Sequence, residues 1–264
     1  ISDCLVGSEM CIRDRPKSCA RGFDGWLLEG NMRSMNTKVR LDNVESLTKF
    51  QKFCFGLLDT KSHYDFSLKV TSEQQSDIQF VAELQDTIMN SVEFSELTRD
   101  ESFKTLAARL MNVSTEDIKI VFPHFRIDLP QSFSDDESKM SLPWHQEAGY
   151  YLPKGDCTPD SIVLSTYLHD CKKDNGAIFV GSEVEPNLAK HITRYMSPDQ
   201  KRFYRVECPE PKMFEVIESE FGEVVAFDFK RPHRSGINTS SLVRLTFLLR
   251  ATSKSELKTF KESA

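Results

Sequence analysis

The segment Leu142–Tyr150 has the sequence LPWHQEAGY and places His145 two residues before Glu147. Its pattern favours an extended strand, and side chains two apart on a strand point to the same face. An imidazole and a carboxylate that project together from one strand supply two ligands of the two-histidine, one-carboxylate site that holds non-haem Fe(II). The third ligand must then come from another part of the chain.

The best candidate for this third ligand is His233, in the segment 227–250, FDFKRPHRSGINTSSLVRLTFLLR. Arg244 follows eleven residues later in a strand-like run, where it shares one face with Thr246. A buried guanidinium needs an anion to satisfy its donors. A dicarboxylate cofactor would fit, and an internal ion pair with Asp or Glu is the alternative.

Four motifs between Phe125 and Arg250 occur in a defined order: FRIDLP at 125–130, WHQExxY at 144–150, DNGAIFVGS at 174–182 and HxSGxNx5R at 233–244. With these motifs the chain resembles the phytanoyl-CoA dioxygenase family of Fe(II)- and 2-oxoglutarate-dependent oxygenases. The last motif is the most specific, because it fixes five residue identities over a defined spacing.

The resemblance implies roles for particular residues. The expected iron ligands, which also form the catalytic centre, are His145, Glu147 and His233. The residues expected to bind the distal carboxylate of 2-oxoglutarate are Arg244, Ser235 and Thr246, and those that align with its pocket are Phe125 and Ser165. The family usually carries aspartate where this chain has Glu147. A carboxylate there argues against the halogenating variants of this chemistry, which leave that ligand position open for halide.

Three further residues are weaker candidates for substrate contact. Trp144 and Tyr150 flank the ligands, although aromatic side chains beside a strand more often serve packing. Arg126 could meet an anionic substrate or simply pair with Asp128, which shares its strand face. The other histidines near the motifs lack a carboxylate at strand spacing and are interpreted as surface or structural residues: His124, His169 and His191.

The expected activity is that of an Fe(II)/2-oxoglutarate-dependent dioxygenase, with O2 as second cosubstrate. It would hydroxylate a C–H bond of a small-molecule metabolite and release succinate and CO2. Two alternatives remain open: a non-catalytic jelly-roll binding protein, and a cupin-type metalloenzyme that does not use 2-oxoglutarate. Arg244 favours the oxygenase over both alternatives, because neither alternative needs a buried cation at that position.

The region between Leu41 and Asp117 is expected to be helical. Apolar residues recur at intervals of three and four in the segments 41–59 and 76–97, and 101–111 predicts a third, shorter helix. Such apolar stripes usually brace a sheet.

From Ile118 onward short alternating runs predict strands separated by turn residues. The expected strands are 119–128, 142–151, 161–169, 177–181, 202–207, 214–216, 223–229 and 242–251. The predicted fold class is mainly β with N-terminal helices, a double-stranded β-helix (jelly-roll, cupin-like) core braced by α-helices. We expect one oxygenase domain over 16–264, with a helical region at 16–117, the jelly-roll core at 118–251 and a tail at 252–264.

Composition narrows the classes of partner. The 264 residues carry a net charge of -6 with both signs mixed, and no run approaches the roughly 18 apolar residues of a membrane span. Neither nucleic acid nor a membrane is therefore an expected partner. The small-molecule substrate follows from the expected activity, and oligomeric state is left open. The seven cysteines lack paired spacing, which favours reduced thiols and a cytoplasmic location.

Residues 1–15 do not follow the pattern of the remaining chain. The segment LVGSEMCIRD at 5–14 resembles the translation of a sequencing-library adaptor. We therefore expect 1–15 to be non-native and disordered, and we exclude it from the fold argument.

Overall fold

The structure is a computed structural model that describes residues 37–133, 141–151, 161–182, 189, 192–195 and 204–255. The expected adaptor segment 1–15 and most of the expected tail lie outside these residues. The helices are α1 (Glu45–Gly56), α2 (His63–Ser76), α3 (Phe80–Met89), α4 (Val92–Thr98), α5 (Glu101–Met111), the short η2 (Thr115–Asp117) and η3 (Gln131–Phe133), and α7 (Glu147–Tyr151). The strands are β1 (Thr37–Arg40), β2 (Ile118–Asp128), β3 (Ser161–Tyr167), β4 (Ile178–Gly181), β5 (Ile192–Tyr195), β6 (Tyr204–Glu207), β7 (Phe214–Ile217), β8 (Glu223–Asp228), β9 (His233–Ser235) and β10 (Arg244–Ser253).

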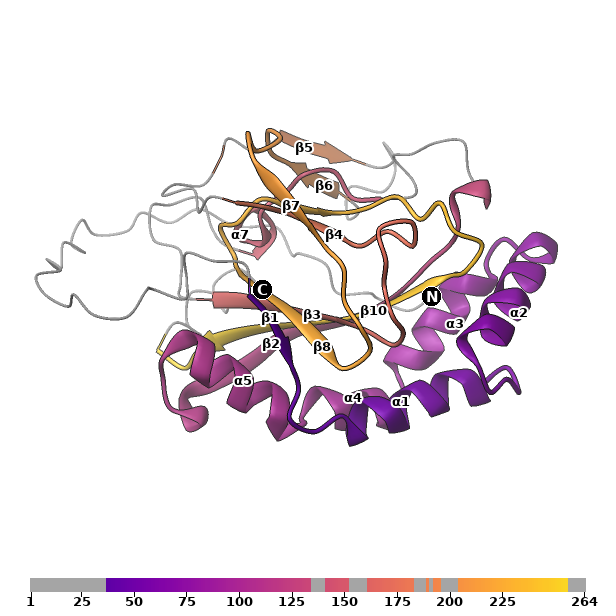
Figure 1. Ribbon diagram of the computed structural model, residues 1–264, viewed down its shortest axis with the longest axis horizontal. Coiled ribbons are helices and arrows are strands. Elements are labelled where there is room, and N and C mark those ends of the chain that lie inside the picture. The colour runs from indigo at the N-terminus through magenta and orange to yellow at the C-terminus, as the bar shows by residue number, and fades with distance from the viewer. Residues whose placement is uncertain are drawn as a thin grey trace, which may run out of the picture.

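The described strands form antiparallel sheets in two layers. A five-stranded sheet has the order β1-β8-β3-β10-β2, a three-stranded sheet has the order β7-β4-β9, and β5 pairs with β6. Figure 1 shows helices α1, α4 and α5 along one side of the five-stranded sheet, while β4 and β7 lie on its other side. This sheet-rich, antiparallel architecture with N-terminal helices confirms the broad fold class expected from the sequence.

The main core lies between the helices and one face of the five-stranded sheet. Phe247 of β10 is fully buried and packs edge-on against Phe94 of α4 and Phe103 of α5. Phe50 of α1 contacts the same ring. The apolar stripes of the helical region therefore brace the sheet, as their spacing indicated.

The opposite face of the five-stranded sheet is turned toward the three-stranded sheet. Val163, Val225 and Phe227 of the large sheet are buried there together with Val180 of β4. On β10 this face carries Arg244, Thr246, Leu248 and Arg250, which alternate with the apolar residues that face the helices. Polar side chains are thus enclosed between two sheets.

The helical region departs from the expected segments in two places. The segment 76–97 is two helices, because the Ser91 hydroxyl accepts a hydrogen bond from the Phe94 N–H and starts α4 after α3 has ended. The sequence pattern did not predict helix α2 as a separate element. This helix buries only a narrow face, with Phe66, Ser67 and Val70, which gives a weak periodic signal.

The expected strand at 142–151 is wrong, because these residues contain no strand. His145 forms an isolated bridge with His233, and the helix α7 begins at Glu147. The Gly149 N–H donates to the Gln146 carbonyl, so the backbone turns directly after the bridge. Strands β1, β5 and β9 were not assigned from the sequence, and β10 continues two residues beyond the expected limit.

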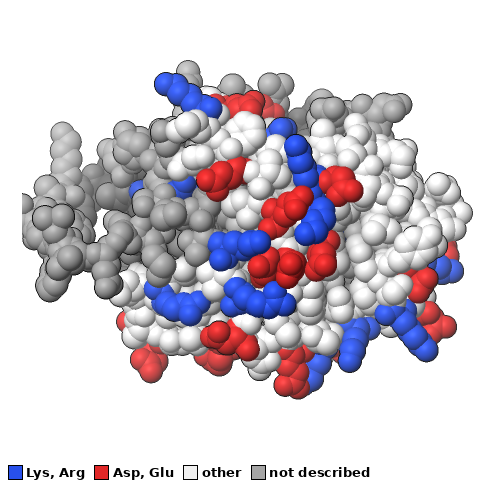
Figure 2. All heavy atoms as spheres, in the orientation of Figure 1, with Lys and Arg blue, Asp and Glu red and all other residues white. Residues whose placement is uncertain are grey.

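Among the described residues, no helix has the length and apolar character required to cross a membrane. Figure 2 shows Lys and Arg interspersed with Asp and Glu over the visible described surface.

Candidate active site

Backbone hydrogen bonds join the two segments that carry the expected iron ligands. His145 and His233 exchange both of their backbone hydrogen bonds, with N–O distances of 3.0 and 2.9 Å. The Ala148 N–H donates to the Phe229 carbonyl at 3.1 Å, and the Gln146 side chain donates to the Lys230 carbonyl. Segment 145–148 is therefore attached to the chain just before and at β9, which holds the ligand side chains in one place.

The structure brings the three expected ligands together. One donor atom each from His145, Glu147 and His233 lies within 4.8 Å of the others, and all three residues are buried. His145 Nδ1 donates to the Pro143 carbonyl at 2.7 Å, and His233 Nδ1 donates to the Arg231 carbonyl at 2.9 Å. These bonds leave each Nε2 as the nitrogen with the lone pair, which is the arrangement typical of metal-ligating histidines. The donor set fits a divalent ion such as Fe(II).

The electrostatic environment keeps the imidazole of His145 neutral. Burial lowers its pKa to about 3, and the neighbouring His233 acts in the same direction. A neutral imidazole is the form that binds a metal.

Glu147 pairs with Arg250, a partner that the sequence pattern did not predict. Arg250 Nε lies 2.9 Å from Glu147 Oε2, and Arg250 Nη2 lies 3.1 Å from Oε1. Burial acts to raise the pKa of Glu147, but Arg250 and His233 outweigh it and hold the pKa well below its usual range. Glu147 Oε1 also lies 3.6 Å from His233 Nε2. The carboxylate is therefore ionised and faces the distal histidine.

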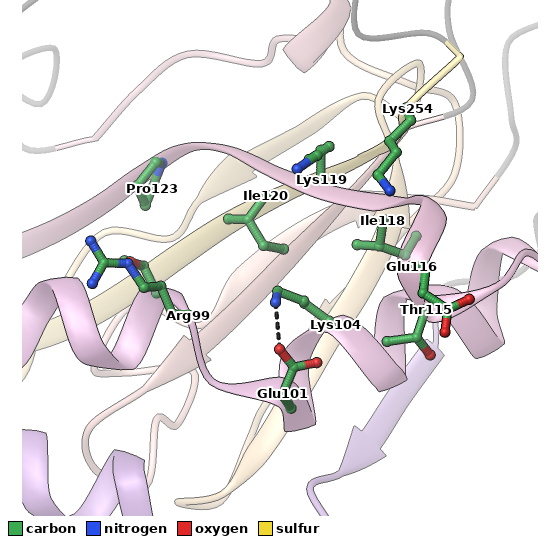
Figure 3. A pocket seen from close by; sticks show the side chains of 11 residues that line it. Arg99, Glu101, Lys104, Thr115, Glu116, Ile118, Lys119, Ile120, Pro123 and Lys254 are labelled. Carbon is green, nitrogen blue, oxygen red and sulfur yellow. Dashed lines mark hydrogen bonds and ion pairs between the residues drawn. The ribbon is translucent and has the colours of Figure 1, made fainter.

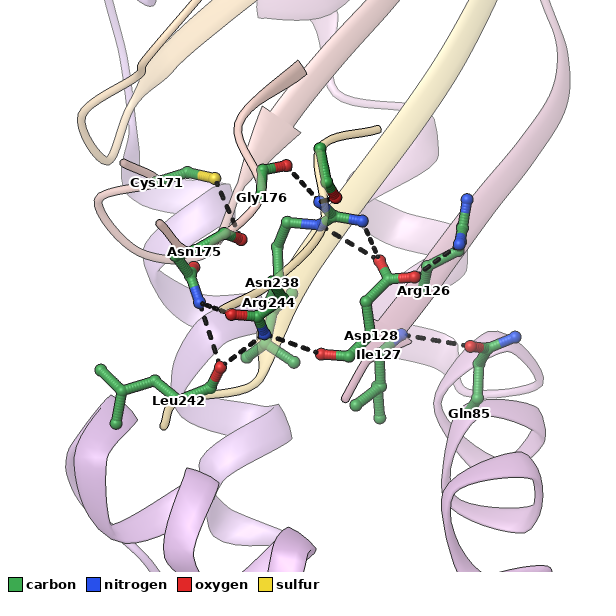
Figure 4. A network of polar contacts seen from close by, with 12 residues as sticks. Gln85, Arg126, Ile127, Asp128, Cys171, Asn175, Gly176, Asn238, Leu242 and Arg244 are labelled. Atoms are coloured by element: carbon green, nitrogen blue, oxygen red, sulfur yellow. Dashed lines mark hydrogen bonds and ion pairs between the residues drawn. The ribbon is translucent and has the colours of Figure 1, made fainter. Parts of the chain in front are cut away.

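Arg244 is fully buried and pairs with Asp128 across the β10–β2 ladder. Arg244 Nε and Nη2 lie 3.2 and 2.9 Å from Asp128 Oδ2, and Arg126 Nη2 lies 2.5 Å from Asp128 Oδ1 (Figure 4). Burial favours a raised pKa for Asp128, but the two guanidinium groups outweigh it and lower the pKa. The internal ion pair considered from the sequence is therefore present.

The rest of the Arg244 guanidinium meets backbone carbonyl groups. Nη1 donates to Gly176, and at 3.1 Å to Gly236, the residue after Ser235. The buried Nη2 forms the ion pair with Asp128 at 2.9 Å, but it makes no contact with hydrogen-bond geometry to the described residues. Arg244 thus keeps unused donor capacity.

Three side-chain contacts fix the backbone on both sides of Arg244. His63 Nε2 of α2 donates to the Val243 carbonyl at 2.7 Å, and the Val243 N–H donates to the Ser67 hydroxyl at 3.2 Å. The Leu245 N–H donates to His169 Nε2 at 3.0 Å, and the His169 ring stacks on His63 at 4.0 Å. His169 is a structural histidine in the folded chain, and α2 holds the strand that carries Arg244.

The register places most of the expected 2-oxoglutarate residues on one face. Thr246 is opposite Tyr167 of β3 and Arg126 of β2, and Ser165 is opposite Leu248, so all lie on the inner face with Arg244. Ser235 shares its strand face with His233 on the facing sheet. Phe125 lies on the other face, where its ring packs at 5.5 Å against Phe50. The structure therefore does not bring Phe125 to the others.

The weaker substrate candidates have different surroundings. Trp144 is 7% exposed and packs against Phe179 and Phe214, with Arg234 5.4 Å from its ring centroid. Arg126 is half-buried on the inner face and pairs with Asp128. The side chain of Tyr150 lies outside the described residues.

Two hollows on the described surface do not include the expected ligands. One, of about 560 Å³, lies between α5 and β2 and is lined by Glu101, Lys104 and Lys254 among others (Figure 3). The other, of about 540 Å³, is lined by Phe179 and Arg234 on the outer face of the three-stranded sheet.

The chain is similar to several solved structures. EvdO2 from Micromonospora carbonacea var. aurantiaca, whose structure has also been determined with 2-oxoglutarate, is 18% identical, with a TM-score of 0.46 over 64% of this chain and 62% of its own. The non-heme monooxygenase ThoJ is 15% identical, with a TM-score of 0.50 over 84% of this chain and 76% of its own. The epimerase SnoN, solved with Fe3+, alpha ketoglutarate and nogalamycin RO, is 13% identical, with a TM-score of 0.46 over 64% and 61%. The chain thus spans less than two thirds of EvdO2. Comparison with curated proteins finds no match.

The structure thus encloses a buried two-histidine, one-carboxylate cluster between antiparallel sheets, the ligand set typical of non-haem Fe(II) sites. The chain belongs to the phytanoyl-CoA dioxygenase family, whose model matches residues 64–246. Enzymes of this family depend on iron and 2-oxoglutarate.

Proposed function

We propose that this protein is an Fe(II)/2-oxoglutarate-dependent dioxygenase that hydroxylates a C–H bond of a small-molecule metabolite. The observation that carries the proposal is the buried cluster of His145, Glu147 and His233. Both histidines donate Nδ1–H to backbone carbonyl groups, and this orientation presents Nε2 to a metal. A purely structural cluster does not require that orientation.

In this proposal several polar residues enclosed between the two sheets have binding roles. His145, Glu147 and His233 hold Fe(II), which with 2-oxoglutarate and O2 supplies the oxidant that inserts one oxygen atom into the substrate and leaves succinate and CO2. Arg244 receives the distal carboxylate of 2-oxoglutarate through the buried Nη2, and Thr246 and Ser235 add hydroxyl groups beside it.

Arg126 is the proposed contact for an acidic substrate. Its side chain is 21% exposed and lies on the same inner face as Arg244. Tyr150 retains the weaker role of lining the substrate pocket, and Ser165 that of lining the cosubstrate pocket. Trp144 is left out of this role, because it packs against Phe179 and Phe214 on the outer face of the three-stranded sheet.

The finer features of the fold belong to the same proposal. The two facing sheets form a jelly roll, and residues 16–264 form one oxygenase domain with a helical part, a core and a tail. The described cysteines, Cys54, Cys171 and Cys208, are buried thiols outside any disulfide, which supports a cytoplasmic protein.

A second candidate, a jelly-roll binding protein without 2-oxoglutarate chemistry, is favoured by one observation. Asp128 already neutralises Arg244, and an internal ion pair of this kind needs no ligand. Binding of 2-oxoglutarate therefore decides between the two functions.

The test is anaerobic addition of Fe(II) and 2-oxoglutarate to metal-free protein, followed by absorption spectroscopy and then by a succinate assay in oxygen. A visible charge-transfer band is expected in the wild type and in Arg40→Ala, which removes only an exposed ion pair with Glu220. The band should be lost or need much more 2-oxoglutarate in Arg244→Ala.

His145→Ala and His233→Ala are expected to lose iron binding while their circular dichroism stays native. Stoichiometric iron in both variants would exclude the metal site. Iron binding without a 2-oxoglutarate band in the wild type would favour the binding protein.

A further inference from the structure

Arg250 grips Glu147 with two parallel contacts inside the protein. Nε and Nη2 of the guanidinium meet Oε2 and Oε1 of the carboxylate at 2.9 and 3.1 Å. The two side chains are 8% and 5% exposed. A two-pronged contact of this kind fixes the plane of a carboxylate as well as its position.

Arg250 is itself held by an irregularity in the neighbouring strand. Its Nη1 donates to the Phe122 carbonyl at 2.7 Å. Phe122 has a φ of 47°, in the left-handed region that an aromatic residue rarely adopts, and the β10–β2 register shifts between Leu248 and Arg250. The bulge thus turns a carbonyl toward the guanidinium, so that a contact from outside the metal cluster helps to fix the position of Arg250.

The grip determines which oxygen Glu147 presents to the histidines. Arg250 holds both oxygens, Oε2 through Nε and Oε1 through Nη2, and the orientation that results places Oε1 3.6 Å from His233 Nε2. Glutamate has one more rotatable bond than the aspartate usual in the family, so its carboxylate has more orientations to lose on binding a metal. Arg250 removes that freedom before a metal arrives.

We propose that Arg250 is a positioning residue of the metal site, which orients Glu147 so that Oε1 completes the ligand set with His145 and His233. This inference rests on the proposed function, because it assumes that the three side chains bind a metal. Arg250 does not bind the metal itself; it acts by orienting the carboxylate of Glu147.

Charge and geometry predict opposite results when Arg250 is replaced. A guanidinium beside a cation site repels the incoming ion, so loss of the charge alone would tighten metal binding. Loss of the grip would weaken metal binding, because replacement of partners that orient metal ligands typically costs about 10- to 100-fold in affinity. The sign of the change therefore separates the two effects.

The experiment measures Co(II) binding to metal-free protein by titration, with the visible Co(II) spectrum recorded at saturation. Arg250→Met removes both the charge and the two-point contact with Glu147, and Arg250→Lys keeps the charge but cannot form the two-point contact. Co(II) affinity is expected to fall about 10- to 100-fold in both variants, with a changed spectrum. Arg40→Met, which removes the exposed ion pair with Glu220, is the matched control and should bind Co(II) like the wild type.

Arg250→Lys is the decisive variant, because it keeps a cation near Glu147 if Arg250→Met fails to fold. Co(II) affinity and spectrum equal to the wild type in Arg250→Lys would overturn the proposal and leave Arg250 as a counter-charge alone. Tighter Co(II) binding in Arg250→Met would overturn it as well. The proposed function itself would fail if the wild type bound no Co(II), or if His233→Ala bound Co(II) as tightly as the wild type.

Discussion

Asp128 and Arg244 lie directly opposite each other in the β2–β10 register, and 2.9 Å separates Oδ2 from Nη2. Arg126 reaches the other oxygen of the same carboxylate. One buried carboxylate therefore balances two guanidinium groups, one of which is the proposed anchor of 2-oxoglutarate. The ion pair holds this anchor in place in the absence of a ligand.

The substitution Asp128→Asn should destabilise the protein and make it more dependent on an anion. Removal of one partner of a buried ion pair costs about 3–5 kcal/mol of unfolding free energy, because the other charge stays buried. Addition of 2-oxoglutarate should then raise the melting temperature more than in the wild type. Urea denaturation and thermal melts measure both effects. Glu220→Gln, which breaks an exposed pair, should cost less than about 1 kcal/mol. A comparable loss in both variants would contradict the argument.

The substitution Gly176→Ala should displace Arg244. Gly176 has a φ of 82°, and an added Cβ would collide with Arg244 Nη1 and lie 2.8 Å from the Gly236 carbonyl oxygen. We expect a loss of about 1–3 kcal/mol in stability and weaker 2-oxoglutarate binding, measured by denaturation and by titration of the visible band.

Gly56→Ala is the matched control for this substitution. Nothing lies within 4 Å of the added methyl group at the end of α1, so stability should be unchanged or slightly increased. Native-like cosubstrate affinity in Gly176→Ala would show that Arg244 does not depend on this close approach.

The substitution Ser67→Ala should loosen the attachment of α2 to the strand that bears Arg244. It leaves the fully buried Val243 N–H without its hydroxyl acceptor, which costs about 1–3 kcal/mol. Ser72→Ala, at an exposed position of the same helix, should change stability by less than about 0.5 kcal/mol. Equal unfolding free energies for the two variants in urea would refute the role of Ser67.

Stability should fall in mild acid because of the stacked pair His63 and His169. Burial lowers both pKa values, that of His169 to about 3 with a contribution from His63. The unfolded chain therefore takes up protons first, so this stabilisation is complete above pH 6.5 and is lost as the pH falls toward 3. Each histidine contributes a slope of at most about 1.4 kcal/mol per pH unit.

His63→Gln tests this pH dependence, because glutamine can still donate to the Val243 carbonyl but does not titrate. The unfolding free energy of His63→Gln, measured in urea between about pH 4 and pH 8, should depend less steeply on pH than that of the wild type. This range includes the ordinary pKa of histidine. Tyr64→Gln, at a position that is 58% exposed, should leave the slope unchanged. Parallel curves for all three proteins would contradict the assignment.

The motifs predicted part of the site because its chemistry requires particular residue types at particular spacings. His145, Glu147 and His233 were identified from their motifs, and alternation on β10 separated Arg244 and Thr246 from the apolar residues that pack on the helices. The extended conformation expected after His145 was wrong, since Glu147 begins a helix. The local alternation of residues cannot predict this helix, because it begins where the Ala148 N–H donates to the carbonyl of Phe229 in another segment.

The sequence by itself determined the chemical identity of the site: the ligand types, the cation that follows the distal histidine, and the face of β10 on which that cation lies. Only the tertiary structure decided the partners of these groups, namely Asp128 for Arg244 and Arg250 for Glu147. The reason is physical. Strand alternation fixes the face of a side chain within its own segment. The contact between charged residues more than 100 positions apart depends instead on strand register, on the bulge at Phe122 and on how the two sheets pack against each other.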